Sequence, residues 1–310
     1  MTLKILHIDL DYPLSTLPRY ELGKKPHPGL LAVLERQRKH YEDIIHSFSE
    51  FTEPLSKLSR LPQSLQLSPH DLTQLSLRYS QAIQGNHEAN EWFKPIAGEV
   101  AREISPCWLN GWIPGLDGMA LYAFMALHKP QNYIEIGSGA STKFAHRAAS
   151  DYRLSTRIIS IDPRPRSEID KLCDKIIRTS LEETDLAIFD NLNAGDMLFF
   201  DGTHRCFTNS DVTVFFLEVL PRLKAGVLVG IHDIFLPYDY PTEWVRKGYS
   251  EQYLLAALLL ANTPMFTVEF PALFISFDKR LSQRMESLWE QIPNVFEKHG
   301  GAFWIRTSKP

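Results

Sequence analysis

Acidic and imidazole side chains follow two apolar segments in the second half of the chain. Asp201 comes directly after the segment Met197–Phe200, and His204 follows within the same short loop. His232 and Asp233 come after another apolar segment further along the chain. Carboxylates and imidazoles at strand ends can act as general bases or hold a divalent metal ion. If the two segments are strands that end at the same sheet edge, a proton-transfer or metal site is expected there.

Two interpretations of this cluster stay open. In the first, Asp201, His232 and Asp233 are the ligands of a metal, and the imidazole nitrogen suits Zn, Fe, Ni or Mn better than Mg. In the second, His232 is a base and no metal binds. A purely structural role is the third possibility, with His204 as a loop histidine and the His232-Asp233 pair in strand-end hydrogen bonds. Asp211 is best interpreted as a helix cap.

A glycine loop lies earlier in the chain. The apolar segment Tyr133–Ile136 runs into Gly137-Ser138-Gly139, and Asp162 ends the next apolar segment. Glycines let a backbone bend sharply and approach a ligand closely, because they lack a Cβ. An acid about twenty residues beyond such a loop can bind the two ribose hydroxyls of a nucleoside. The pattern therefore predicts a nucleoside-containing cofactor.

The neighbours of the loop favour S-adenosylmethionine (SAM) over NAD. A dinucleotide loop usually has a third glycine where this chain has Thr142. Glu135 would repel a pyrophosphate, but it suits the ammonium or sulfonium end of SAM. Ser141, in the first turn of the following helix, completes the predicted loop contacts. An NAD-dependent oxidoreductase and a non-enzymatic SAM-binding module remain the rival interpretations.

The elements that must position these residues alternate between strand and helix. This alternation predicts an α/β fold with a doubly wound, mostly parallel sheet and helices on both faces. In such sheets ligands bind at the carboxyl ends of the strands, where all the residues above fall. The expected strands are 133–136, 157–161, 175–178, 197–200 and 226–231, and the expected helices are 141–149, 167–173, 185–191 and 211–220. The tail is expected to add a helix near 251–262, apolar runs at 266–270 and 273–277, a strand at 302–306 and an antiparallel pair at the sheet edge.

The first part of the chain has a different pattern. Residues 1–30 are rich in proline and predict an irregular arm, and helical spacing follows from Gly29 to Phe51. A second helix is expected after the Ser68-Pro69-His70-Asp71 start signal. We therefore expect a helical N-terminal cap over 1–105 and a cofactor-binding domain over 106–310.

Composition limits the partners. The net charge of −4 offers no global basic field for nucleic acid, and the three scattered cysteines fit a reducing cytoplasm. The longest apolar run, Tyr253–Ala261, is about half of a membrane span. The expected partner is a small molecule, with neither nucleic acid nor membrane, and a homo-oligomer is left open.

Four motifs together resemble a known family. IEIGSGAST, ISIDPRPR, GDMLFFDGTHRCFTNSD and LPRLKAGVLVGIHDIFLPYDYP are similar to segments of class I SAM-dependent methyltransferases, in the group akin to catechol- and macrocin-type O-methyltransferases. The resemblance spans roughly residues 108–262 and implies a Rossmann-like sheet. It also implies that Glu135, Gly137 and Gly139 surround the methionine moiety, that Asp162 binds the ribose, and that Ser180 lies near the adenine.

The resemblance also bears on the acidic cluster. In the catechol-type relatives these two strand ends supply a magnesium site, and the matching positions are Asp201, His232 and Asp233. The site of the relatives is all oxygen, so His232 departs from it. The implied activity is O-methylation of a hydroxylated small molecule, with the catalytic help expected from Asp201, His204, His232 and Asp233. Trp108, Trp112 and the segment Leu236–Trp244 are expected to wall the acceptor pocket.

Overall fold

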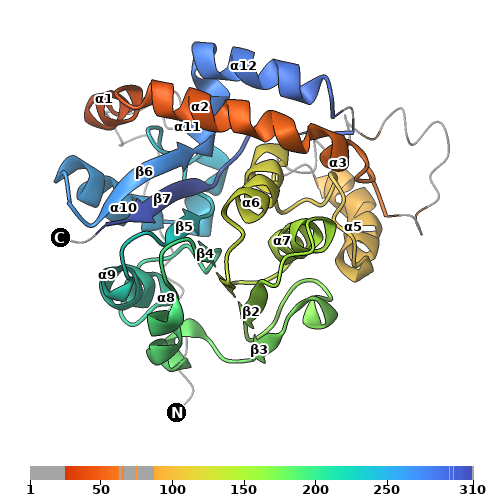
Figure 1. Ribbon diagram of the computed structural model, residues 1–310, viewed down its shortest axis with the longest axis horizontal. Coiled ribbons are helices and arrows are strands. Elements are labelled where there is room, and N and C mark those ends of the chain that lie inside the picture. Colours follow the sequence, from red (N-terminus) through yellow and green to blue (C-terminus); the bar gives the residue numbers. More distant parts are fainter. Residues whose placement is uncertain are drawn as a thin grey trace.

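The fold is built around one mixed sheet. The computed structural model describes residues 25–62, 65, 75, 87–292, 294–295 and 297–308. The seven strands follow the order β3-β2-β1-β4-β5-β7-β6 (Figure 1). Their bounds are β1 Asn132–Ile136, β2 Arg157–Ile161, β3 Lys175–Ile177, β4 Met197–Phe200, β5 Leu228–Ile231, β6 Phe266–Pro271 and β7 Phe303–Thr307.

The strand pairing confirms the predicted doubly wound, mostly parallel sheet. Strands β1 to β5 pair in parallel, and β7 pairs antiparallel with both β5 and β6. The strand order reverses between β1 and β4, which is where ligands bind in such sheets. Ile136 lies opposite both Ile161 and Phe200, and Phe200 lies opposite Ile231. The residues that follow these four positions therefore emerge side by side.

Helices cover both faces of the sheet. In Figure 1, α6 and α7 lie on one side of the sheet and α8 and α9 on the other, while α2 and α12 run next to each other. The α-helices are α1 Pro28–Glu35, α2 Arg38–Phe48, α3 Thr52–Ser56, α5 His87–Arg102, α6 Gly115–His128, α7 Ala140–Asp151, α8 Asp211–Val214, α9 Leu220–Arg222, α10 Glu251–Leu260, α11 Ala272–Phe277 and α12 Lys279–Trp289. A π-helical turn, Phe215–Val219, joins α8 to α9.

Several predicted elements differ in the structure. The helices expected at 167–173 and 185–191 are short 3-10 turns, Asp170–Leu172 and Leu186–Asn191. The apolar run 273–277 lies in a helix, α11. The start signal at 68–71 and residues 1–24 of the predicted arm lie outside the described residues. The division of the chain at residue 105 stays a prediction.

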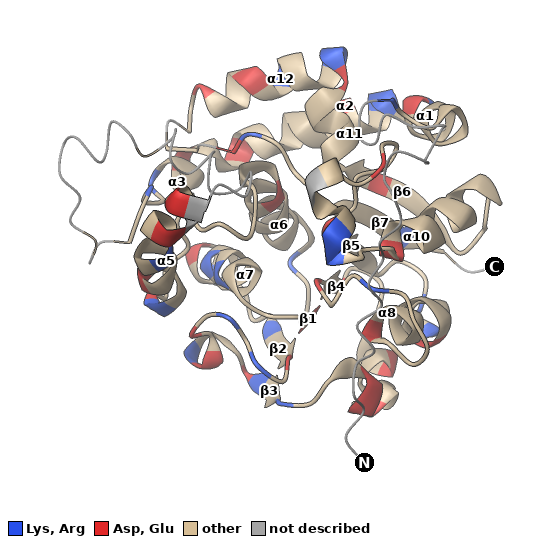
Figure 2. Cartoon of the chain, turned by 180° about the vertical axis from the view of Figure 1, so that it is seen from behind, with Lys and Arg blue, Asp and Glu red and all other residues tan. Residues whose placement is uncertain are grey.

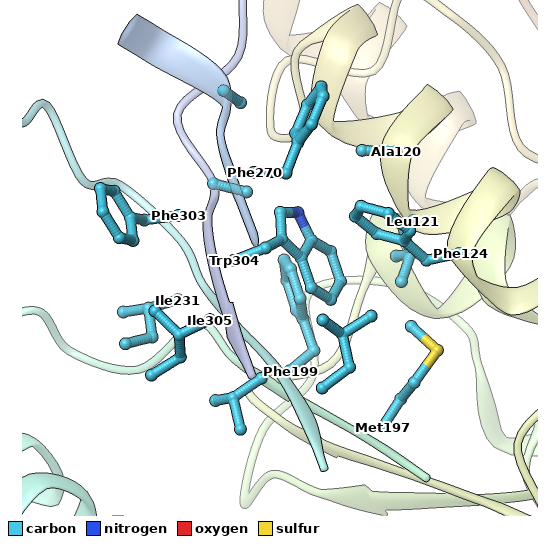
Figure 3. Close-up of a cluster of buried hydrophobic side chains, with 14 of the residues drawn as sticks. Ala120, Leu121, Phe124, Met197, Phe199, Ile231, Phe270, Phe303, Trp304 and Ile305 are labelled. Carbon is cyan, nitrogen blue, oxygen red and sulfur yellow. The ribbon is translucent and has the colours of Figure 1, made fainter. Parts of the chain in front are cut away.

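Strand β7 brings a large aromatic side chain into the central core. Trp304 is fully buried and packs against Phe124 of α6 and Phe199 of β4, with ring centroids 5.0 and 5.5 Å apart (Figure 3). Gly230 on β5 makes this possible. A Cβ there would lie 2.7 Å from the Phe199 ring and 2.8 Å from the Trp304 ring. A glycine inside a buried strand is thus explained by close packing.

The surface mixes charges of both signs. Figure 2 shows acidic and basic residues together on α5 and on α12, in keeping with the small negative net charge. Among the described residues, no helix has both the length and the apolar character needed to cross a membrane.

His128, at the end of α6, is expected to make folding sensitive to mild acid. Its burial, together with the nearby Arg306 guanidinium, lowers the pKa of the imidazole to about 4. The unfolded chain, with a pKa of about 6.5, then binds the proton more tightly than the folded protein. The stability that neutral His128 contributes is therefore complete above about pH 6.5 and is lost as the pH falls towards 4.

The expected loss for wild type is on the order of 1 to 2 kcal/mol between pH 7 and 5. Thermal unfolding of His128→Gln across this range should show a shallower fall in Tm than wild type shows. His46→Gln, at an exposed position on α2, is the matched control and should follow wild type. Parallel Tm curves for wild type and His128→Gln would contradict the assignment.

Candidate active site

The glycine loop crosses directly over the end of β4. Gly137 N–H donates to Ile161 O at 3.0 Å, and Asp201 N–H donates to Ile136 O at 2.8 Å. Gly137 has a φ of +78°, and a Cβ there would lie 1.8 Å from the carbonyl oxygen of Asp201. Only glycine has the backbone freedom and the lack of side chain that this crossing needs. The loop thereby joins the ends of β1, β2 and β4.

A first cavity of about 250 Å³ opens beside this loop. Five of the six predicted cofactor residues line it, namely Gly137, Gly139, Ser141, Asp162 and Ser180. Gly139 has no atom within 4 Å of the place that a Cβ would occupy. A side chain at position 139 would therefore occupy the cavity without touching the rest of the protein.

Asp162 is held rigidly at the edge of this cavity. Its Oδ2 accepts the Ser138 N–H at 2.8 Å and its Oδ1 accepts the Arg164 N–H at 2.7 Å. An ionised carboxylate has about four lone-pair sites, so both oxygens can still accept hydrogen bonds from a ligand. The two backbone amides therefore pre-orient the carboxylate toward the cavity.

Glu135 differs from its prediction, because its side chain does not line the cavity. It is fully buried, where Oε1 accepts the Tyr133 hydroxyl at 3.0 Å and Oε2 accepts the Thr142 hydroxyl. Thr142 Oγ1 in turn accepts the Gly139 N–H at 3.0 Å. Burial raises the pKa of Glu135 to about 7, and hydrogen bonds from Ser141, Thr142 and Tyr133 oppose the rise. The carboxylate thus braces the loop from behind.

A second, larger cavity of about 570 Å³ adjoins the first. Trp112, Arg166 and Asp201 line both cavities. The second cavity contains the acidic and histidine cluster that the sequence predicted, since His204, His232 and Asp233 also line it. Further walls come from Gly111, Pro114, Phe235, Pro241, Trp244, Lys247, Tyr249, Leu273, Glu297, His299, Gly300 and Gly301.

Some of the predicted wall residues line the second cavity and others do not. Trp112 does so, as do Pro241 and Trp244 from the segment Leu236–Trp244. Trp108 lies in the core, where its ring packs 5.4 Å from the Phe144 ring, so its prediction as a pocket wall is wrong.

His204 is held between carboxylates on both sides of its ring. Its Nδ1 is hydrogen-bonded to the fully buried Glu251 at the start of α10. Its Nε2 lies 3.2 Å from Asp201 Oδ1 and 3.4 Å from Asp233 Oδ2. Neither ring nitrogen of His204 is left without a carboxylate neighbour.

His232 is enclosed in a similar way. Its Nδ1 lies 3.3 Å from Asp201 Oδ1 and 3.6 Å from Asp233 Oδ1. Its Nε2 lies 3.3 Å from Asp117 Oδ2, close enough for an ion pair but not aligned as a hydrogen bond. Asp117 itself accepts the backbone N–H groups of Gly301 and Ala302.

The carboxylates control the protonation of both imidazoles. Burial by itself would lower the pKa of His204, but Glu251, Asp201 and Asp233 outweigh it and hold that pKa well above its usual value. The pKa of His232 is raised in the same manner. Burial would raise the pKa of Asp201, but the two imidazoles hold it well below its usual range. These directions favour a network of imidazolium–carboxylate pairs.

Two residues of this network have unusual backbones. His204 has a φ of +62° and Asp233 a φ of +54°, so both adopt the left-handed conformation. Non-glycine residues adopt it uncommonly, and such positions are concentrated at active sites. Both side chains are thereby directed into the second cavity.

The network does not fit the predicted metal site at Asp201, His232 and Asp233. Across the described residues, no group of three or more His, Cys, Asp or Glu side chains is arranged to hold a metal ion. The physical reason lies in the donor atoms, because both nitrogens of His232 face carboxylate oxygens. We therefore derive no step through a metal.

Sequence reasoning missed three contributors to the site. Asp117 and Glu251 are buried acids on α6 and α10. Asp211 was expected to cap its helix, but Ser210 is the cap and Asp211 lines the first cavity. The Asp211 carboxylate accepts the N–H and hydroxyl of Thr203, both at 2.6 Å. It therefore holds the loop after β4.

Part of the sequence matches the model of a known protein family. Residues 134–234, which are 101 of the 310 residues, match the model of a family described as a methyltransferase domain. This stretch is similar to methyltransferase domains. The methyltransferase-like stretch contains the glycine loop, Asp162, and the strand ends that carry Asp201 and His232. A comparison with curated proteins gave no match.

Solved structures give more distant likenesses. An SAH-bound methyltransferase from Podospora anserina is 16% identical, covers 80% of this chain and 100% of its own, and has a TM-score of 0.42. An O-methyltransferase from Bacillus cereus in complex with SAH is 14% identical, covers 86% of this chain and 100% of its own, and has a TM-score of 0.41. These values are too low to transfer chemistry to this chain.

Proposed function

We propose that the protein is a SAM-dependent methyltransferase that transfers the methyl group to an oxygen of a hydroxylated small molecule. The observation that carries the proposal is the junction of the two cavities at Asp201. The first cavity has a glycine loop and a rigid acid suited to a nucleoside cofactor, and the second holds a proton-accepting network. A donor in one cavity and an acceptor in the other would meet at this junction.

The first cavity would hold SAM through residues at the ends of β1, β2 and β3. Asp162 would accept the ribose hydroxyls, Ser180 would lie near the adenine, and the loop with Gly137 and Gly139 would surround the methionine part. When bound, SAM supplies an electrophilic methyl group on a sulfonium sulfur. Glu135 would act indirectly, by holding the loop through Thr142.

The second cavity would bind and deprotonate the acceptor. A hydroxyl oxygen is a weak nucleophile until a base removes its proton. Since carboxylates flank both nitrogens of His204, we assign proton acceptance to Asp233, which lines only the second cavity. His204 and His232 would orient that carboxylate and Asp201. Much of the rate gain would come from holding the acceptor oxygen at the junction.

The alternative function is that of an NAD-dependent oxidoreductase, which would bind NADH in place of SAH. Calorimetric titrations of the protein with SAH and with NADH separate the two proposals. We expect micromolar-range binding of SAH and no binding of NADH. Binding of NADH without SAH would overturn the methyltransferase proposal.

Asp162→Ala is expected to weaken SAH binding by about 100-fold. The variant loses two hydrogen bonds from the ribose to a charged acceptor, each of which contributes about 1.5 kcal/mol or more. Calorimetry measures the change in Kd. Asp190→Ala is the matched control, because Asp190 is exposed and lines neither cavity. Unchanged SAH affinity in Asp162→Ala would contradict the placement of the ribose.

A further inference from the structure

Two cationic side chains line the second cavity without a carboxylate partner. Arg166 and Lys247 are both wall residues there. In the part of the chain that the structure describes, no carboxylate oxygen lies within 4.0 Å of either charged group. Some other basic residues are paired, for example Arg38 with Asp278 and Arg306 with Glu269. The two cations of the cavity are thus available to a ligand.

Aromatic rings hold these cations in place. The Arg166 Cζ atom lies 4.8 Å from the centroid of the Trp112 ring, and Lys247 Nζ lies 3.2 Å from that of Trp244 and 5.0 Å from that of Tyr249. A cation over a ring face is attracted by the ring's quadrupole. A stacked guanidinium also keeps its in-plane N–H groups free for a bidentate anion. The rings therefore pre-orient both cations without consuming their hydrogen-bond donors.

The charges around Lys247 favour an anionic neighbour. Burial lowers the pKa of Lys247, the charge of Asp233 opposes this fall, and the charge of Arg166 adds a smaller lowering. The two cations thus lie near enough to repel each other. An anion between them would relieve this repulsion, and it would regain the interactions that the ammonium loses on burial.

The remaining walls fit an apolar body and a hydroxyl end. Phe235, Tyr249 and Leu273 provide apolar contacts, and Glu297 and His299 are polar wall residues. His204 Nε2 lies 3.2 Å from Asp201, a residue of both cavities, and 3.4 Å from Asp233. The volume of about 570 Å³ falls in the range of small-molecule sites, about 300–1,000 Å³. A molecule there would have its hydroxyl beside Asp233 and its other end beside the cations.

We propose that the methyl acceptor is a hydroxylated compound with an apolar body and an anionic group, a carboxylate or a phosphate, which Arg166 and Lys247 bind together. This inference rests on the proposed function, because it names the acceptor class of the same site. Lys247 lines only the second cavity, whereas Arg166 lines both. Lys247 is therefore the residue that separates acceptor binding from cofactor binding.

The test measures binding by calorimetry to the protein saturated with SAH. The probes are para-hydroxybenzoate, para-hydroxycinnamate, the methyl esters of both acids, and para-hydroxyphenyl phosphate. Each ester keeps the ring and hydroxyl of its acid and removes only the charge. We expect at least one acid to bind about ten-fold more tightly than its methyl ester, or the phosphate to bind about ten-fold more tightly than hydroquinone, its uncharged counterpart. The comparison between acid and phosphate identifies the anionic group.

Variants test the two cations. Lys247→Met and Arg166→Gln should each reduce the preference for the charged probe by several-fold, and the double variant should abolish it. SAH affinity in Lys247→Met should stay at the wild-type value. Lys39→Met is the matched control, because Lys39 is an exposed lysine of α2 that lines neither cavity.

Three results would overturn the inference. In the first, the protein binds SAH tightly but shows no preference for any charged probe. In the second, it binds SAH tightly but binds no probe. In the third, Lys247→Met loses as much affinity for SAH as for the probe. Absence of SAH binding to wild type would overturn the proposed function as well. The failure of each proposal is thus distinguishable.

Discussion

Gly137→Ala is expected to lower the free energy of unfolding by more than about 3 kcal/mol, through overpacking and backbone strain together. The added Cβ would lie 1.8 Å from the carbonyl oxygen of Asp201, and the neighbour is backbone that cannot rotate away. The φ of +78° adds a conformational cost for alanine. The loop must move to relieve the contact, and SAH binding should be lost with it.

Two other glycines separate the causes of this effect. Gly195 also has a positive φ, +90°, but no atom lies within 4 Å of the position that its Cβ would take. Gly195→Ala therefore measures backbone strain alone, which we expect to cost about 1–2 kcal/mol. Gly139→Ala adds a methyl group only to the open first cavity, so it should keep the wild-type Tm and weaken SAH binding. Denaturant unfolding and calorimetry measure both quantities. A Gly137→Ala variant as stable as Gly195→Ala would contradict the crossing of the loop over β4.

Asp233→Asn is expected to lower kcat by about 10²–10⁴-fold, the usual contribution of a general base. Asparagine has the same shape and tolerates the left-handed φ of +54°, so the backbone should stay in place. The substitution removes the capacity to accept the acceptor's proton, together with one of the charges that raise the pKa values of His204 and His232. SAH affinity should change little, since Asp233 lines only the second cavity.

The rate is measured as methyl transfer from labelled SAM to the hydroxylated probe that binds most tightly. Asp190→Asn, at an exposed aspartate remote from both cavities, should keep the wild-type kcat. A kcat of Asp233→Asn within about three-fold of wild type would remove Asp233 from the mechanism, since such a change is far below the effect of losing a base.

The sequence by itself determined the central sheet and most of the predicted residues that line the first cavity. Strand and helix alternation is a local pattern, and it predicted β1 to β5, α7 and the helical segment from α8 to α9. The placement of Asp162 beside the glycine loop follows from the same local pattern. The loop after one strand and the end of the next strand lie at the same edge of a parallel sheet. The predicted cofactor residues that line the first cavity were found for this reason.

Only the tertiary structure decided which side chains meet across the acceptor side. Glu135 faces inward to Thr142, His204 meets Glu251 of α10, and His232 meets Asp117 of α6. Arg166 and Lys247 line one cavity although they lie far apart in the chain. Local periodicity predicts elements and their buried faces, but contacts between distant segments depend on how those elements pack. The residues of the first cavity were therefore predictable from one stretch of the chain, while those of the second cavity come together only when the helices pack on the sheet.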